Sequence, residues 1–112
     1  MTPYELAERH PRLFHLTEPD SLAAITRWGL LPTGELLKRC AVPVAERRRL
    51  TSTRRPAAVE LEHEEVGRVV INDNLPLSEK ALLKCLDDGM SPSDWLRLLN
   101  GMVFFWPSEQ TL

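Results

Sequence analysis

LFHLTEPDSLAAITRWGLLPT, residues 13–33, joins a predicted strand directly to a predicted helix. Residues 13–17 alternate in the manner of a strand, so that Leu13, His15 and Thr17 share one face while the two residues between them share the other. His15 and Thr17 are therefore expected to point the same way, next to the start of the helix that follows.

The helix after this strand carries signals at both ends. Asp20 or Ser21 suits the N-cap, the helix runs through Trp28, and Gly29 suits the left-handed residue that ends it. The first N–H groups of a helix have no partner within the helix, and they attract anions. We therefore expect a phosphorylated ligand at this junction of strand and helix.

Short helices and strands account for the rest of the chain, which favours one mixed α+β domain over residues 1–112. Thr33 is the expected cap of its own helix, and alternating apolar runs mark the strands. The expected helices cover residues 2–10, 34–40, 43–49, 78–86 and 91–100, and the expected strands cover 59–63, 68–72 and Met102–Trp106, the first two as a hairpin.

Two motifs resemble those of a known family. The first is F-H-L-T at residues 14–17, continued by S-L-x-x-I-x-x-W-G-L-L at 21–31, and the second is L-L-N-G-M-V-F-F-W at 98–106. With these motifs the chain resembles an uncharacterised bacterial domain family and, more distantly, the DarT-like ADP-ribosyltransferases. The matching stretches are Phe14–Leu31, Arg54–His63, Val69–Leu77, Leu86–Asp94 and Leu98–Trp106.

The resemblance implies a small ADP-ribosyltransferase-like split sandwich that binds NAD in a cleft between two small sheets, without a metal. In such a fold His15 and Thr17 would contact a ribose of NAD, and Arg54 would hold the pyrophosphate or take part in catalysis. The aromatic strand near the end of the chain would line the nicotinamide pocket. The cofactor-binding residues implied in this way are His15, Thr17, Ser21, Gly29, Phe105 and Trp106.

Two departures from the family pattern bear on catalysis. Residues 71–74 read Ile-Asn-Asp-Asn where the family is expected to read Ile-Arg-Asp-Gln, so a positive charge is missing. The carboxylate that activates the ribose in such enzymes normally follows the aromatic strand, whereas this chain ends at Leu112 and resembles a shortened version of a longer fold. Glu109 is the one carboxylate after that strand, and it joins Arg54 as a candidate catalytic residue.

Each candidate also has an ordinary structural interpretation. From the residues alone His15 is expected in a core position with a hydrogen bond to backbone, and it is the family pattern that favours ligand contact. Thr17 also suits a turn or a cap. Arg47–Arg49 fit a solvated helix face, and Arg54 fits either a ligand contact or a solvated position. Arg55 precedes a proline and is expected to be exposed.

The aromatic residues near the end of the chain suit stacking on a flat ring such as nicotinamide. On a strand Phe104 and Trp106 face one side and Phe105 the other, so at most one set faces a pocket, and their ordinary role is in a core. As an apolar strand near the terminus, Met102–Trp106 also suits self-association or a protein partner.

Charge and composition argue against several classes of protein. A net charge of −2 gives no indication of nucleic-acid binding, so a nucleic acid stays open only as an acceptor of ADP-ribose. No apolar run reaches the length of a membrane span and no signal peptide opens the chain, which predicts a cytoplasmic protein without membrane contact. The three histidines and two cysteines are not spaced as metal ligands usually are, so no metal site is expected.

Two functions remain open from the sequence. One is an NAD-binding, ADP-ribosyltransferase-like domain, in which an acid supplied outside the matched stretches assists the departure of nicotinamide. The other is a non-catalytic binding or interaction module on the same scaffold, which the short length of the chain favours.

Overall fold

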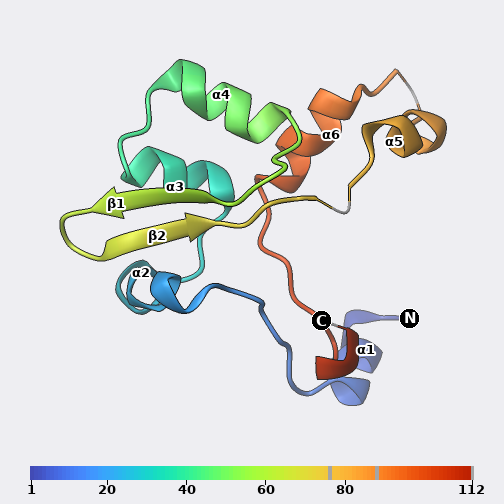
Figure 1. The fold of residues 1–112 in the computed structure, drawn as a ribbon. Helices are drawn as coiled ribbons and strands as arrows, with labels where there is room; N and C mark the ends of the chain where they lie inside the picture. The colour runs from blue at the N-terminus through green and yellow to red at the C-terminus, as the bar shows by residue number, and fades with distance from the viewer. Residues whose placement is uncertain (76, 88, 112) are drawn as a thin grey trace.

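A computed structural model describes residues 1–75, 77–87 and 89–111. Within these residues the chain forms six α-helices, two short 3-10 turns and a two-stranded antiparallel sheet, as expected for an α+β domain (Figure 1). None of the helices in the described part of the chain is long and apolar enough to cross a membrane. In chain order the elements are α1 Pro3–Arg9, η1 Pro19–Ser21, α2 Leu22–Trp28, α3 Thr33–Arg39, α4 Val44–Ser52, β1 Val59–His63, β2 Gly67–Ile71, α5 Glu79–Cys85, α6 Pro92–Leu99 and η2 Glu109–Thr111.

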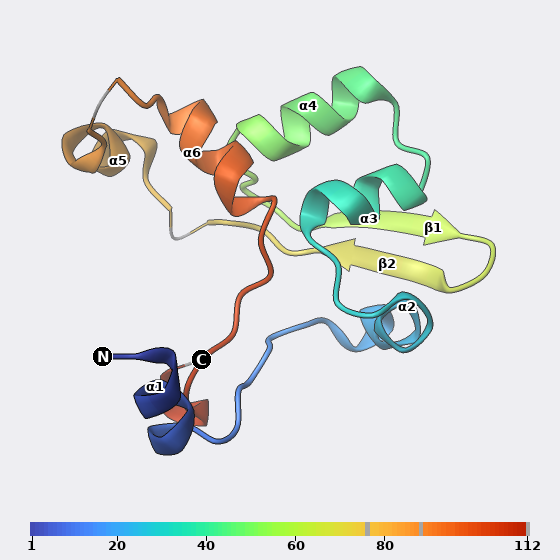
Figure 2. The ribbon, with the colours of Figure 1, turned by 180° about the vertical axis from the view of Figure 1, so that it is seen from behind.

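The β1–β2 hairpin lies at the centre of the fold, and the predicted pairing of these two segments is confirmed. Its register runs from Val59 opposite Ile71 to His63 opposite Gly67. Helices α3 and α4 lie on one side of the hairpin and α2 on the other, with α6 beside α4 (Figures 1 and 2). Because helices cover both sides, the end of β2 is buried, whereas the glutamates of β1 face outward as predicted.

Two small apolar clusters form the core, and both are built on the hairpin. Ala24 and Val69 pack with Val66 between α2 and the sheet. Leu37, Leu50 and Ile71 join α3 and α4 to the end of β2. The two clusters therefore fix the helices around β2, at the point where the strand passes into the loop at residues 72–74.

Local capping signals set the start of three of the described α-helices and the end of one. Thr2 and Ser91 each open a helix with a capping box, and Ser78 accepts a hydrogen bond from the N–H of Ala81. Gly29 ends α2 with φ of 80°, a conformation that favours glycine. The prediction that Thr33 caps α3 is wrong: Thr33 is the first helical residue, and no side chain caps the helix.

Two extended arms replace the strands predicted at residues 13–17 and 102–106, and both strand predictions are wrong. The arms meet in one antiparallel bridge between Phe14 and Trp106, with N···O distances of 2.9 and 2.7 Å. Neither arm adds a strand to the hairpin, so the described residues contain one sheet rather than the two that the resemblance implied. The arms lead away from the hairpin to α1 and η2, which lie together near the two termini (Figures 1 and 2).

Candidate functional site

A cavity of about 460 Å³ lies between α2, the start of α3, the end of β2 and the two arms. Its wall is mostly apolar, with a few polar groups, which is the usual make-up of a small-molecule site. The residues predicted to bind a cofactor that line it are His15, Thr17, Ser21, Gly29 and Trp106. Phe105 does not line the cavity, but its ring centroid lies 5.7 Å from that of His15.

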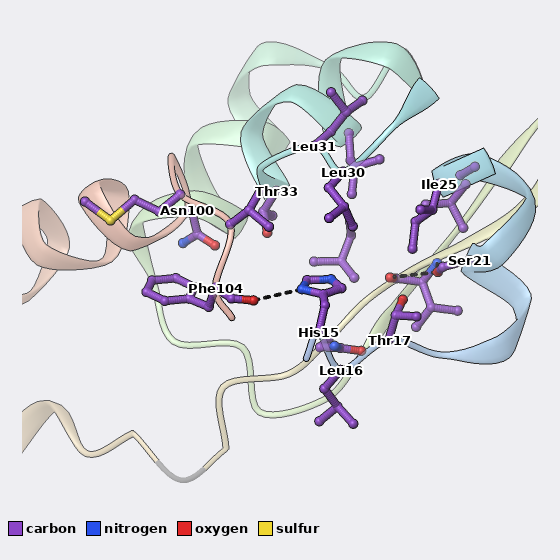
Figure 3. Close-up of a pocket in the computed structure, with 18 of the residues that line it drawn as sticks. His15, Leu16, Thr17, Ser21, Ile25, Leu30, Leu31, Thr33, Asn100 and Phe104 are labelled. Carbon is purple, nitrogen blue, oxygen red and sulfur yellow. Dashed lines mark hydrogen bonds between the residues drawn. The ribbon is translucent and has the colours of Figure 1, made fainter. Parts of the chain in front are cut away.

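His15 is held in the cavity by the other arm. Its Nδ1 lies 2.8 Å from the carbonyl oxygen of Phe104, and Figure 3 shows the imidazole between Phe104 and Thr17. A carbonyl oxygen only accepts, so Nδ1 carries the proton of this bond. In the neutral ring Nε2 is then an acceptor, free to receive a hydrogen bond from a hydroxyl group of a ligand.

Ser21 has a structural task at the base of the cavity. Its hydroxyl accepts from the N–H of Val70 at 3.0 Å and lies 3.3 Å from the carbonyl oxygen of the same residue. These are the backbone groups on the edge of β2 that does not pair with β1, and they would otherwise be buried without partners. The buried Ser21 therefore fastens the start of α2 to the sheet.

Arg55 is the charged residue that sequence reasoning missed, and the expectation that it is exposed is wrong. The side chain is 7% exposed and lines the cavity. Its Nε donates to the carbonyl of Asn72 at 3.0 Å, and its Nη1 donates to the carbonyl of Leu50 at 2.8 Å and to Oδ1 of Asn100 at 2.9 Å. Burial lowers the pKa of the guanidinium and the charge of Asp73 raises it, yet an arginine stays protonated.

Tertiary contacts with residues distant in the sequence bury the Arg55 side chain. A proline after Arg55 shapes the local backbone, but the side chain is covered by the loop after β2 and by the end of α6, 17 and 45 residues away. The sequence did contain a partial signal for the residues around Arg55. Asn100 belongs to the second family motif, and a polar run at residues 72–74 follows a buried strand. Both segments line the cavity.

Two predicted candidates lie outside the cavity. Arg54 donates from Nε to the carbonyl of Leu77 at 2.7 Å and also donates to the carbonyl of Leu75, and neither it nor these two residues line the cavity. Glu109 lies in η2 at the far end of the second arm and does not line the cavity. The structure thus brings neither candidate catalytic residue next to His15.

Acidic and metal-binding groups are sparse at this site. Asp73 is the acidic residue in the lining of the cavity, and its Oδ1 accepts from the N–H of Leu75 at 2.9 Å. Across the described ranges, no group of three or more histidine, cysteine, aspartate or glutamate side chains is arranged to hold a metal ion.

Comparison with known proteins bears on the family but not on the activity. The model of a family of unknown function (DUF7002) matches residues 11–112. No curated protein matches the chain, and no solved structure matches it. The prediction that the chain belongs to an uncharacterised domain family is confirmed. The link to the DarT-like ADP-ribosyltransferases stays a prediction. Since the match spans both arms and the hairpin, the chain belongs to the family of unknown function DUF7002.

Proposed function

We propose that this chain is an ADP-ribosyltransferase-like domain that binds NAD in the cavity beside His15. One observation carries the proposal: four of the stretches with the family resemblance contribute residues to one cavity although they are separate in the sequence. These stretches are Phe14–Leu31, Arg54–His63, Val69–Leu77 and Leu98–Trp106. Its volume of about 460 Å³ lies within the range of small-molecule sites, roughly 300–1,000 Å³.

The polar groups of the cavity suit a nucleoside. With Nδ1 bound to the carbonyl of Phe104, His15 offers Nε2 as an acceptor for a ribose hydroxyl. The half-buried Thr17 lies on the same arm and offers a hydroxyl that both donates and accepts. These two groups therefore suit the vicinal hydroxyls of a ribose.

The apolar part of the cavity suits a flat ring. Phe104 and Trp106 line it together with aliphatic residues of α2 and of the segment after Gly29. Stacking on an aromatic side chain contributes about 1–3 kcal/mol per base and depends little on which base it is. Nicotinamide and adenine are both rings of this kind, and NAD contains both.

The positions of the acidic groups favour a second function, in which the domain binds NAD without transferring ADP-ribose. Asp73, the acidic residue in the cavity lining, already accepts a backbone N–H with Oδ1, and Glu109 does not line the cavity. A catalytic acid must be preorganised beside the reacting ribose. We therefore propose NAD binding as the function of the cavity and nicotinamide release as the property that separates enzyme from binding module.

Calorimetric titration of the purified chain with NAD tests the proposal. His15→Ala removes the acceptor of the cavity, and His10→Ala is the matched control, because His10 lies at the end of α1 outside the lining. Loss of one neutral hydrogen bond predicts a fall in affinity of about 3–10-fold for His15→Ala, and no change for the control.

The two outcomes of this titration are distinct. Saturable binding of NAD that weakens in His15→Ala alone supports the cavity as the site, and an assay for free nicotinamide then shows whether the bound dinucleotide is cleaved. If the folded protein does not bind NAD, or if both histidine variants bind it equally well, the proposed site is wrong.

A further inference from the structure

The charge of Arg55 is buried without a bound carboxylate. The side chain is 7% exposed, and its three hydrogen-bond acceptors are two backbone carbonyls and the side-chain amide of Asn100. All three acceptors are neutral. The ion pairs found among the described residues involve other arginines and Lys38, not Arg55. A buried cation is stable only with good partners, and an anion is the strongest of them.

One nitrogen of this guanidinium remains available. The side-chain hydrogen bonds of Arg55 to the described residues use Nε and Nη1, which leaves the two N–H donors of Nη2. Among the described residues no fully buried side-chain nitrogen lacks a partner, so Nη2 keeps contact with open space. The side chain lines the cavity, which accounts for its small exposed fraction.

We infer that Nη2 of Arg55 binds the phosphate or carboxylate oxygen of the ligand that occupies the cavity. The guanidinium is already oriented by three hydrogen bonds that it donates to α4, to the residue that caps α6 and to the loop after β2, so binding an anion costs little further side-chain entropy. An arginine is well suited to this task, because its charge is permanent and its N–H groups match the geometry of an oxyanion.

This assignment narrows the class of ligand. Two polar residues of the lining, Asn72 and Asn100, accept hydrogen bonds from the guanidinium, and the Asp73 carboxylate lies near enough for its charge to act on Arg55. The other polar residues of the lining are His15, Thr17, Ser21, Thr33 and Asn74, and the rest of the wall is apolar. The ligand is therefore an amphipathic anion: a largely apolar or aromatic body with one oxyanion at Arg55. The choice of a nucleotide as the ligand rests on the function proposed above. In a nucleotide the oxyanion is a phosphate, so nucleotides should bind more tightly than the nucleosides they contain.

Matched pairs of small molecules test the inference. Calorimetry compares AMP with adenosine and nicotinate with nicotinamide, so that each pair differs in one anionic group and distinguishes phosphate from carboxylate. We expect the anionic member of at least one pair to bind about tenfold or more tightly, as charge-assisted hydrogen bonds predict. Arg55→Met should abolish this preference. The matched control is Arg48→Met, which removes one positive charge from an exposed position of α4.

A second readout does not depend on the variant folding. The guanidinium N–H resonances of Arg55 in the native protein, followed by NMR during titration with pyrophosphate, should shift saturably. Equal binding of both members in both pairs overturns the inference, as does a preference that survives in Arg55→Met. Resonances that stay in place with pyrophosphate also overturn it.

The two proposals fail separately. If pyrophosphate moves the Arg55 resonances while NAD does not bind, the anion site stands and NAD is the wrong ligand. If NAD binds equally to the native protein and to a folded Arg55→Met, the nucleotide site stands and the role of Arg55 is wrong.

Discussion

Asn100→Ala should destabilise the whole domain, because this side chain joins Arg55 to two helices. Asn100 is 6% exposed. Its Oδ1 accepts from Nη1 of Arg55 at 2.9 Å, and its Nδ2 donates to the carbonyls of Thr51 at 3.1 Å and Leu96 at 2.8 Å. In the variant, the carbonyl of Leu96 still accepts a hydrogen bond from the backbone N–H of residue 100. The N–H of Arg55 and the carbonyl of Thr51, in contrast, each lose a hydrogen-bond partner.

Two unsatisfied groups set the size of the effect. Each buried polar group left without a partner costs about 1–3 kcal/mol, so the free energy of unfolding should fall by about 2–6 kcal/mol. For a domain of this size the corresponding fall in melting temperature is roughly 10–25 °C. The slope of the free energy against urea should stay the same, because the surface exposed on unfolding hardly changes.

Urea unfolding followed by far-ultraviolet circular dichroism measures this change. The matched control is Asn72→Ala, because the exposed Asn72 uses its backbone carbonyl rather than its side chain to hold Arg55. The control should stay within about 0.5 kcal/mol of the native protein. If Asn100→Ala costs no more than Asn72→Ala, Arg55 is not held as described and the arguments built on its orientation are wrong.

Three further predictions concern stability. Leu37→Ala should lower the free energy of unfolding by about 2–5 kcal/mol in urea, because Leu37 is fully buried in the cluster that joins α3 to β2; an equal cost for Leu83→Ala, at a largely exposed position, would contradict this. Gly29→Ala should cost about 1–2 kcal/mol in thermal unfolding, since φ is +80° there although space for a methyl group exists; an unchanged melting temperature would refute the strain argument. Hydrogen bonds from the backbone and side chain of Ser91, and then from Arg97, lower the pKa of Asp94 below its ordinary 3.8. Asp94 therefore stabilises the fold above that pH, and this stabilisation is lost as the pH falls through the folded pKa. The melting temperature of Asp94→Asn should depend less on acid pH than that of the native protein, and an identical pH profile would count against the capping box.

Features governed by neighbours in sequence were predictable. The hairpin followed from alternation in β1, and the caps at Ser78 and Ser91 followed from residues three positions apart. Gly29 ended its helix because the left-handed conformation is a local property of glycine. His15 and Thr17 were placed on one side because an extended chain alternates whether or not it joins a sheet.

Features governed by distant contacts were not predictable. Residues 13–17 alternate like a strand, but a strand needs a partner along its length, and the arm meets one only at Phe14. The burial of Arg55 depends on Asn72, which follows β2, and on Asn100, which approaches when α6 packs on α4. Arg54 was favoured because the family pattern offered a role for an arginine, whereas Arg55 was expected to be exposed because it precedes a proline, a local feature that does not decide where the side chain lies.

Backbone NMR of the native protein during titration with NAD tests directly whether the cavity between the two arms and the end of β2 is the binding site. The proposed site predicts saturable shifts in the cavity-lining segments around His15, around residues 69–74 and in Leu99–Trp106. It predicts no shifts in α5, which lies outside the lining. Shifts confined to α5 and the loop held by Arg54, or no shifts from a folded protein, would contradict it.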